Sequence, residues 1–476
     1  MCVWQRCFSA AIVGLTVSAH ALAQGPILPS LGESPAADVL GTPGHPLAPV
    51  GTSGQLVPAD DAEIYNRGPL HEAFATPSPS DPLTPPVVVR QPPEPIDELP
   101  PTEAPEGANV TWISGYWAYD ESLDDFLWVS GLWRDIPPGR VWVPGYWTEA
   151  AGGWQWISGV WMSDEQAQVT YVPSPPLSQE RGPNIEPPGE NFFWIPGHWS
   201  YAATNYQWSP GYWAPHQSQW IWVPAKYVWT PAGCIFVAGY WDYVVPDRGL
   251  CYAPVYFHHH HLPVRYTPSV CLDSWNLLTL HLFVRPIYGN YCFGDYYGPR
   301  YANFGYVPFY DFHQRRGYDP LFVHLRYQYG PQYTGQLRNW HQYFVANAQF
   351  RPQPTFRQQR ELLALHADNP VVRASSIALM SDRLADTNAP IRLARLTDQH
   401  RQQQEEQARQ LRAFTNERLR VELDHSRTPG RNENPIPGIP RGQGRGLQLS
   451  DAVRIERSIA GRAEAKIRPP ESPDRL

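Results

Sequence analysis

Histidine and cysteine are the residues of this chain most suited to metal or redox chemistry. Four consecutive imidazoles could bind zinc or copper, namely His258, His259, His260 and His261. Adjacent side chains on a strand point to opposite faces, so a single ion would also need a distant ligand such as His281 or His324. We therefore expect an exposed loop at 258–261 and no metal cofactor.

Four cysteines follow the N-terminal leader: Cys234, Cys251, Cys271 and Cys292. In an oxidising compartment an even number of cysteines allows disulfides, and four cysteines allow three pairings. Buried thiols are the alternative, and the spacing does not choose between the two.

Signatures of catalysis are missing from the sequence that follows the leader. It has no Gly-x-Ser-x-Gly, phosphate-loop, His-Glu-x-x-His or Cys-x-x-Cys motif. No two acids stand apart as a pair that would cleave a glycoside. The sequence therefore predicts a protein that is not an enzyme and binds no cofactor.

Tryptophan is the residue that organises the chain. The phrase aromatic-x-x-Gly-x-aromatic occurs in six clean copies, at 112–117, 128–133, 142–147, 156–161, 194–199 and 208–213. Two decayed copies follow at 222–227, where Ala225 replaces Gly, and at 236–241, which starts on Phe236. The starts at 128, 142 and 156 lie fourteen residues apart, as do those from 194 to 236. Such a fixed period indicates a repeat architecture.

Exposed indoles in these copies could stack on sugar rings or on proline-rich peptides, which makes them a candidate binding platform. The platform would consist of Trp112, Trp117, Trp128, Trp133, Trp142, Trp147, Trp156, Trp161, Trp194, Trp199, Trp208, Trp213, Trp222 and Trp241. The alternative is that the indoles pack against one another as the core of a sheet, and we expect packing to dominate.

Each copy has the composition of β structure, with turn residues between copies. We expect one strand of about eight residues and one loop of about six per copy. The fold would then be mainly β, an antiparallel meander of about eight strands. The central glycine would leave room for an indole from a neighbouring strand to lie flat on the backbone. An alternative places a corner at the Pro-Gly or Ser-Gly step and gives two short strands per copy.

Composition divides the chain into segments. We expect a signal peptide at 1–23, a proline-rich disordered arm at 24–108, repeat blocks at 109–161 and 194–257 with a proline-rich connector at 162–193, an irregular aromatic β segment with short helices at 258–354, an α-helical region at 355–425 and a disordered tail at 426–476. Within the arm, 67–75 is either a short docking peptide or a turn. The main helix would begin near Pro390, capped by Thr387 or Asn388, and its partial apolar stripe suggests a coiled coil.

The N-terminus has the pattern of a secretory signal. Arg6 precedes an apolar run at 8–17, and Ala21-Leu22-Ala23 forms a small-residue cleavage site. No later stretch is apolar enough for a transmembrane helix, so we expect no membrane span in the mature chain. Export to the periplasm, cell envelope or extracellular space follows. The Arg- and Gly-rich run at 441–446 is similar to nucleic-acid-binding tails, but in an exported protein we expect a flexible linker and no nucleic-acid partner.

The phrase Trp142-Val143-Pro144-Gly145-Tyr146-Trp147 resembles the repeat of the YXWGXW (Trp-x-x-Gly-x-Trp) family, which occurs in exported bacterial proteins of unknown role. The resemblance to longer, planctomycete-type members extends to 68–75, 253–257 and 293–297, and so covers about residues 67–300. It implies export and a repeat fold, and it supplies no activity and no catalytic residues.

These features together predict a non-enzymatic structural or interaction protein of the cell envelope, built on a Trp-rich β-repeat scaffold. Its partners would be envelope proteins or wall polysaccharide. The alternative is a carbohydrate- or wall-polymer-binding module that uses exposed aromatic rows. A row of exposed indoles would favour binding, whereas covered indoles would favour the scaffold.

Overall fold

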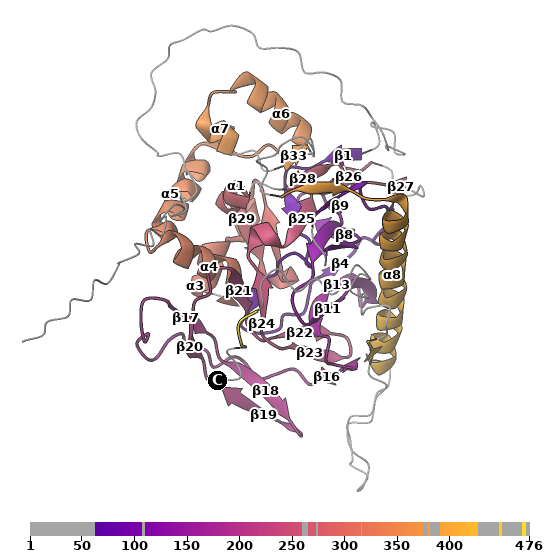
Figure 1. Cartoon of the computed structure of the whole chain (residues 1–476), viewed down its shortest axis with the longest axis vertical. Coiled ribbons are helices and arrows are strands. Elements are labelled where there is room, and N and C mark those ends of the chain that lie inside the picture. The colour runs from indigo at the N-terminus through magenta and orange to yellow at the C-terminus, as the bar shows by residue number, and fades with distance from the viewer. Residues whose placement is uncertain are drawn as a thin grey trace, which may run out of the picture. The chain divides into compact units, whose positions relative to one another are not determined.

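The computed structural model describes most of the chain from residue 62 onwards (Figure 1). The described residues are 62–106, 110–258, 265–272, 275–315, 317–374, 378–380, 391–426, 447–449 and 469–472. The signal peptide expected at 1–23, the histidines at 259–261 and most of the tail expected at 426–476 lie outside them. The described residues belong to a single unit.

Every copy of the repeated phrase bends at its central x-Gly step and forms two short strands. In the first block these are β7 (Val110–Ile113), β8 (Tyr116–Asp120), β9 (Asp125–Val129), β10 (Leu132–Asp135), β11 (Arg140–Val143), β12 (Tyr146–Ala150), β13 (Gly153–Ile157) and β14 (Val160–Ser163). In the second block they are β17 (Phe192–Ile195), β18 (His198–Ala202), β19 (Asn205–Ser209), β20 (Tyr212–Pro215), β21 (Trp220–Val223), β22 (Lys226–Thr230), β23 (Gly233–Val237) and β24 (Tyr240–Tyr243).

Consecutive copies pair with each other as bent antiparallel hairpins. β8 pairs with β9 and β7 with β10, so the first copy lies antiparallel to the second along its whole length. The same pairing recurs three times, and we number the results hairpin 1 (110–135), hairpin 2 (140–163), hairpin 3 (192–215) and hairpin 4 (220–243). The mainly β, antiparallel character is confirmed. The expectation of one long strand per copy is wrong, because the x-Gly step is a corner and not the middle of a strand.

The register of each hairpin sets aromatic residues opposite one another. Trp112 faces Trp133, and Trp117 faces Trp128, so the first aromatic of each copy meets the second aromatic of its partner copy. Across the four hairpins the ring centroids of these pairs lie 5.1 to 5.7 Å apart. Such separations suit edge-to-face and tilted packing, which adds to the stability gained by burying the rings.

The glycine of each corner lies under an indole, which confirms that it makes room for a ring from the paired copy. A Cβ added to Gly145 would stand 2.5 Å from Cζ2 of Trp156, far inside van der Waals contact. Hairpin 4 departs from the phrase at both of the equivalent positions. Ala225 replaces the glycine there, and Phe236 replaces the tryptophan of the paired copy. The added methyl group at the corner is thus accompanied by a smaller aromatic ring opposite it.

The proline-rich arm is built into the fold. Residues 62–106 form six short strands: β1 (Ala62–Ile64), β2 (Gly68–Pro69), β3 (Ser78–Pro79), β4 (Val87–Val88), β5 (Asp97–Glu98) and β6 (Glu103–Pro105). Each pairs with a strand from another part of the chain. The expectation of disorder over 24–108 is therefore wrong for 62–106. This segment lacks a core of its own, but it buries side chains such as Phe74, which is 0% exposed, against surfaces that the repeats provide.

The connector between the two blocks is also described. It contains β15 (Gln168–Val169) and β16 (Tyr171–Val172), and β16 extends the sheet of β22 and β23. Beyond it, the chain runs over the surface without regular structure to residue 191.

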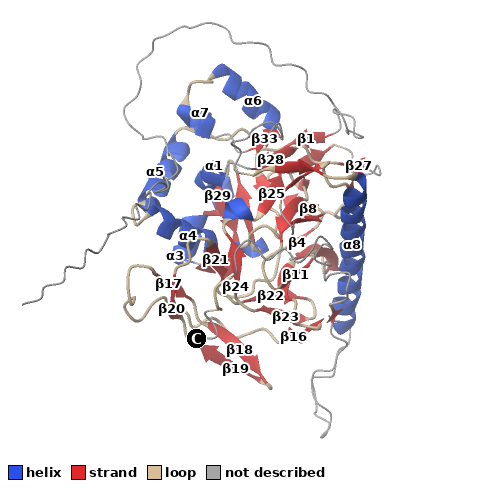
Figure 2. Cartoon of the chain, viewed as in Figure 1, coloured by secondary structure: helices blue, strands red, loops and turns tan. Residues whose placement is uncertain are grey.

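Residues 244–374 combine short strands with helices, which agrees with the irregular β structure and short helices expected from 258 (Figure 2). The strands are β25 (Gly249–Tyr252), β26 (Val255–Phe257), β27 (Arg265–Tyr266), β28 (Val270–Leu272), β29 (Leu282–Arg285), β30 (Asn290–Phe293), β31 (Val307–Pro308) and β32 (Gly317–Tyr318). The helices are α1 (Trp275–Leu280), α2 (Pro299–Asn303), α3 (Phe309–Arg315), α4 (Pro320–Tyr329), α5 (Tyr333–Ala346), α6 (Phe356–Leu365) and α7 (Pro370–Ala374), with 3₁₀ turns at Val245–Asp247, Pro286–Tyr288 and Ala348–Phe350. Three further strands lie nearer the C-terminus: β33 (Ala378–Met380), β34 (Leu393–Arg395) and β35 (Leu447–Gln448).

The long helix α8 (Asp398–Ser426) starts later than the expected position near Pro390. The residues before it form β34, which pairs with β6 of the arm, and Thr397 Oγ1 accepts from the backbone N–H of His400 in the first turn. The buried side chains of α8 include Leu411 and Phe414, and the helix packs along β7 and β12 of the first block (Figure 1). The coiled coil stays a prediction. Among the described residues, no helix is long and apolar enough to cross a membrane.

Candidate functional site

At one x-Gly bend in each of hairpins 1, 2 and 3, which we call the corner, two N–H groups donate to the same carboxylate. They belong to the indole of the first Trp of the phrase and to the backbone of its Gly, three residues later. In three of the four hairpins, both groups donate to one glutamate carboxylate that comes from outside the repeats. The three residues are Glu98 in hairpin 1, Glu72 in hairpin 2 and Glu180 in hairpin 3.

Glu98 closes β5 and accepts three hydrogen bonds in the corner of hairpin 1. The donors are Gly115 N at 2.6 Å, Gly131 N at 2.9 Å and Trp128 Nε1 at 3.0 Å. The residue is 1% exposed. A proline-rich stretch of the arm is thereby fixed to the repeat through a single buried carboxylate.

Glu72 fills the corresponding place in hairpin 2. Its two carboxylate oxygens accept from Trp156 Nε1 and from Gly159 N, each at 2.8 Å. The carbonyl of the next residue, Ala73, accepts from Trp161 Nε1 at 3.1 Å. The segment 67–75 of the arm thus docks on the repeats, as the prediction of a docking peptide stated, and it also forms a turn at 72–74.

Glu180 fills the corner of hairpin 3 from the connector. Its carboxylate accepts from Trp194 Nε1 at 3.2 Å and from Gly197 N. The glutamate is half-buried, unlike its two counterparts, and the connector on both sides of it is largely exposed.

The two buried glutamates are held by hydrogen bonds, and Arg412 and Arg418 act on Glu98 and Glu72 through longer-range attraction. In the described part of the chain, neither Glu72 nor Glu98 takes part in a salt bridge. Burial raises the pKa of Glu98 to about 7, while its three N–H donors act in the opposite direction. Burial likewise raises the pKa of Glu72, against the donors of Trp156 and Gly159. Each of these corners therefore binds a carboxylate through the placement of its indole and backbone N–H donors.

Hairpin 4 has the same bend but a different corner. Trp222 Nε1 is buried and has no hydrogen-bond partner among the described residues. Trp241 Nε1 donates to the backbone carbonyl of Glu471, at 3.2 Å. Phe236 has no indole N–H to donate, and the Trp241 indole contacts a backbone carbonyl of the segment near the C-terminus in place of a carboxylate.

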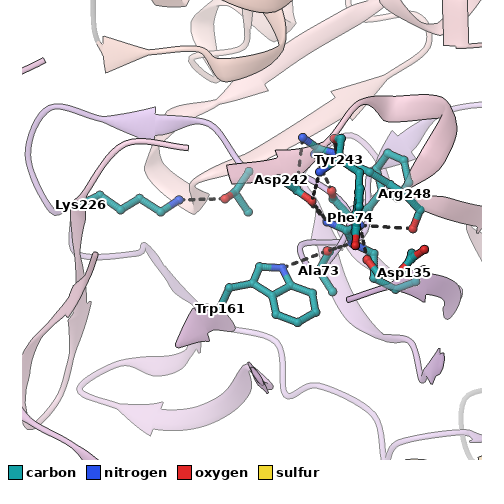
Figure 3. A network of polar contacts seen from close by, with 10 residues as sticks. Ala73, Phe74, Asp135, Trp161, Lys226, Asp242, Tyr243 and Arg248 are labelled. Carbon is teal, nitrogen blue, oxygen red and sulfur yellow. Dashed lines mark hydrogen bonds and ion pairs between the residues drawn. The ribbon is translucent and has the colours of Figure 1, made fainter. Parts of the chain in front are cut away.

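A second polar cluster clamps the segment that carries Glu72 (Figure 3). Arg134 Nε donates to the carbonyl of Ala73 at 2.9 Å, and Arg248 Nη1 donates to the carbonyl of Phe74 at 2.8 Å. Both guanidinium groups pair with Asp242, at 2.6 and 3.2 Å. Since Arg134 lies on β10 and Asp242 on β24, this buried cluster joins the first repeat block to the second. Two guanidinium groups share one carboxylate there, and backbone carbonyls accept further hydrogen bonds from them, which suits a structural role.

His71, beside Glu72, is held in one neutral form. The backbone N–H of Ala73 donates to His71 Nδ1 at 3.1 Å, so the other ring nitrogen, Nε2, carries the proton and donates to the Ser114 carbonyl at 3.2 Å. Burial lowers the pKa of His71 to about 4. A proton added at Nδ1 would break the bond from Ala73, so the geometry agrees with this direction.

The histidines considered for metal binding are not brought together. His258 is exposed, and its ring packs 5.2 Å from that of Tyr256; its three followers lie outside the described residues. His281 is hydrogen-bonded to the Tyr297 hydroxyl, and His324 packs against His216. Within the described ranges, no group of three or more His, Cys, Asp or Glu side chains could hold a metal ion.

Three of the four cysteines are buried thiols. Cys234, Cys251 and Cys292 are free and buried, and Cys271 is 1% exposed. Burial raises the pKa of Cys251 and Cys292 well above the ordinary range, which makes them poor nucleophiles.

The candidate aromatic platform is mostly covered. Nine of its fourteen tryptophans are buried, and the other five are half-buried: Trp147, Trp194, Trp199, Trp208 and Trp213. None of the large hydrophobic side chains that are exposed in the described residues is a tryptophan. Four of the five half-buried indoles belong to hairpin 3, so whatever platform remains is confined to that hairpin.

The three corner glutamates are the functional residues that the motif search did not find. A signal for them exists in the repeats themselves, because buried indole N–H groups usually have an acceptor and the repeated phrase contains no carboxylate. Each glutamate also follows a proline within four residues: Pro69 precedes Glu72, Pro95 precedes Glu98 and Pro176 precedes Glu180.

Comparison with known families matches the hairpins. The model of the WXXGXW repeat, which spans two copies, matches residues 107–134, 138–162, 190–214 and 204–226. The first three matches coincide with hairpins 1, 2 and 3, and the fourth joins the second copy of hairpin 3 to the first copy of hairpin 4. Neither the curated proteins nor the solved structures contain a significant match to this chain.

Proposed function

From the premise that this chain carries the repeats of the WXXGXW family, we propose that it is a non-enzymatic, exported scaffold and interaction protein of the cell envelope. The observation that carries the proposal is the use made of the repeats. Their indoles pack against one another, and their corners hold glutamate-bearing segments of extended chain. A fold of this kind organises polypeptide arms.

Burial of the indoles supports a scaffold over a sugar-binding surface. A carbohydrate platform needs several exposed rings in a row, and the first block presents none among its eight phrase tryptophans. The alternative function, binding of carbohydrate or wall polymer, keeps one observation in its favour. The four tryptophans of hairpin 3 are half-buried, and their free edges could stack on a sugar ring.

Export is tested by fusing the full chain to alkaline phosphatase, which becomes active only outside the cytoplasm. We expect activity from the fusion and its loss when residues 1–23 are deleted. An inactive fusion, or one that stays active without residues 1–23, would contradict export through this leader.

The interaction role is tested in producing cells with a photo-crosslinking amino acid at Gln207, an exposed position on β19 of hairpin 3. We expect crosslinks to envelope proteins, identified by mass spectrometry. The same amino acid at Gln410, an exposed position on α8, is the matched control. In parallel, the purified chain should stay in solution when wall polysaccharide is sedimented. Co-sedimentation that is lost in Trp208→Ala would replace the scaffold proposal with the carbohydrate alternative.

A further inference from the structure

Hairpin 3 holds its glutamate segment far less firmly than hairpins 1 and 2 hold theirs. Glu98 and Glu72 are 1% and 2% exposed, and the arm around them is paired into sheets. In contrast, the connector segment at 175–187 forms no strand, and its apolar side chains point to solvent. Leu177 is 80% exposed and Ile185 is 61% exposed. The segment therefore contributes almost no apolar burial that would keep it in place.

The contacts that do hold the segment are made by its backbone and by one carboxylate. Trp199 Nε1 donates to the carbonyl of Leu177 at 3.1 Å, and Trp213 Nε1 donates to the carbonyl of Ile185 at 2.9 Å. The side chain that enters the corner belongs to Glu180. Any extended peptide with a glutamate in this register could make the same bonds, because backbone carbonyls are common to all sequences.

One further bond ties the segment to the rest of the chain. Ser178 N donates to the Asp81 carboxylate at 2.7 Å. Asp81 lies outside hairpin 3, so this bond helps to keep the connector in place but is not part of the binding site in the corner.

The corner of hairpin 1 shows how much sequence variation this kind of recognition tolerates. Its occupant contains Pro92-Pro93 followed by Glu98, whereas the occupant of hairpin 3 contains Pro175-Pro176 followed by Glu180. The carbonyl of Glu94 accepts from Trp117 Nε1, the indole opposite Trp128, at 2.9 Å. In hairpin 3 the carbonyl of Ile185 accepts from Trp213 Nε1, the indole opposite Trp194. The two segments share a Pro-Pro pair and a glutamate, and little else. Prolines keep such a segment extended before it binds and so reduce the entropy lost on docking.

We propose that the corner of hairpin 3 is an exchangeable binding site for extended, proline-rich peptides that carry a glutamate, and that residues 175–187 are its resident occupant. The proposal deepens the interaction role proposed above and rests on it. A partner peptide presents its carboxylate to Trp194 Nε1 and Gly197 N and displaces the connector. The connector competes at the high effective concentration of a tethered ligand, so binding in trans is weak until the connector is weakened or released.

The test uses the full chain and a fluorescein-labelled synthetic peptide with the sequence of residues 173–187, followed by fluorescence anisotropy. In the variant Glu180→Ala the resident segment loses its carboxylate, and we expect the peptide to bind about tenfold or more tightly than to the unmodified chain, since hydrogen bonds to a charged group are the strong ones. Glu186→Ala is the matched control, because this exposed glutamate of the same segment stays outside the corner, and it should bind the peptide as the unmodified chain does.

Two further measurements separate specific binding from adhesion. A peptide with Gln in place of the glutamate should bind the Glu180→Ala chain about tenfold less tightly. Adding Trp194→Phe to that chain removes the indole N–H, keeps an aromatic ring and should remove most of the binding. Melting curves confirm that each variant is folded, and Glu180→Gln replaces Glu180→Ala if the latter is not.

Equal affinities for the unmodified, Glu180→Ala and Glu186→Ala chains, or no binding to any of them, would overturn the exchangeable site. This result is independent of the crosslinking experiment in cells. Crosslinks to envelope proteins without peptide binding would refute the exchangeable site but support the interaction role. Peptide binding without crosslinks would support the site but refute the interaction role in the envelope.

Discussion

Replacing Glu98 with alanine should unfold much of the protein, although the substitution removes no charge pair and little apolar surface. Three donors would lose their acceptor at once: Gly115 N, Gly131 N and Trp128 Nε1. A buried donor left without a partner costs about 1–3 kcal/mol. Water entering the space vacated by the side chain would satisfy some of the three, so we expect a total loss of about 3–6 kcal/mol.

The size of this loss decides the outcome because whole domains are stable by only about 5–15 kcal/mol. Glu98→Ala should therefore lower the denaturant midpoint sharply or leave the chain partly unfolded in buffer. Glu180→Ala is the matched comparison, since it removes the same kind of carboxylate from a half-buried corner where water can take its place. It should cost only about 1.4 kcal/mol, the free energy that corresponds to the tenfold gain in peptide binding expected above.

Denaturation in guanidinium, followed by tryptophan emission at pH 8, measures both variants, and at this pH most of the Glu98 side chain is ionised. Glu98→Gln separates the acceptor from the charge, because the amide keeps one oxygen and should lose an intermediate amount of stability. Equal losses for Glu98→Ala and Glu180→Ala would refute the idea that buried corner hydrogen bonds hold the repeats in place.

Four more outcomes follow from the packing. Gly145→Val should cost about 1–3 kcal/mol by overpacking, measured by the same denaturation, and unchanged stability would contradict the indole seat on the glycine. The neutral, buried His71 has a lowered pKa, so its contribution to stability is present above about pH 6.5 and disappears as the pH falls toward about 4; melting of the wild type and of His71→Gln from pH 7 to 4 should show the two converging. A fragment of residues 109–165 should not give the sharp, separate melting transition that 109–350 gives, because hairpin 1 shares its buried clusters with later segments; a sharp transition in the short fragment would favour independent beads. Limited proteolysis should spare 62–106 along with the repeats, and early cleavage there would contradict the docked arm.

The sequence predicted the structure of the repeats more completely than the structure of the segments around them. The spacing of Trp and Gly was enough to predict antiparallel pairing and an indole seated on Gly145, because both follow from ring size and the absence of a Cβ. The position of the bend was not, since Ser114-Gly115 and Pro144-Gly145 fit a bulge as well as a corner. Pairing across the hairpin, which a single strand cannot reveal, selects the corner.

The docked arm was missed for a different physical reason. A proline- and acid-rich segment cannot form a core by itself, and composition measures only what a segment can do alone. The repeats change this balance by offering buried indole N–H groups that need acceptors. Counting donors against acceptors in the repeat would have pointed to external carboxylates such as Glu98, and to the arm that carries it.

The late start of α8 has the same origin. The sequence before it contains a plausible cap and a proline, which together favour a helix near Pro390. Leu393–Arg395 instead completes a two-stranded ladder with Glu103–Pro105 of the arm. A local signal for a helix thus lost to a partner nearly three hundred residues away, which no local pattern contains.

Because each glycine lies under an aromatic ring of the paired copy, the two positions limit which substitutions the repeats can accept during evolution. A methyl group added at one glycine is harmful while the opposing ring is an indole, and harmless only once that ring has shrunk. Hairpin 4 carries both changes together, Ala225 and Phe236, and neither occurs singly in the other three hairpins. The heritable unit is therefore the pair of copies: mutations should be accepted as compensating couples, and the array should lengthen or shorten by two copies at a time.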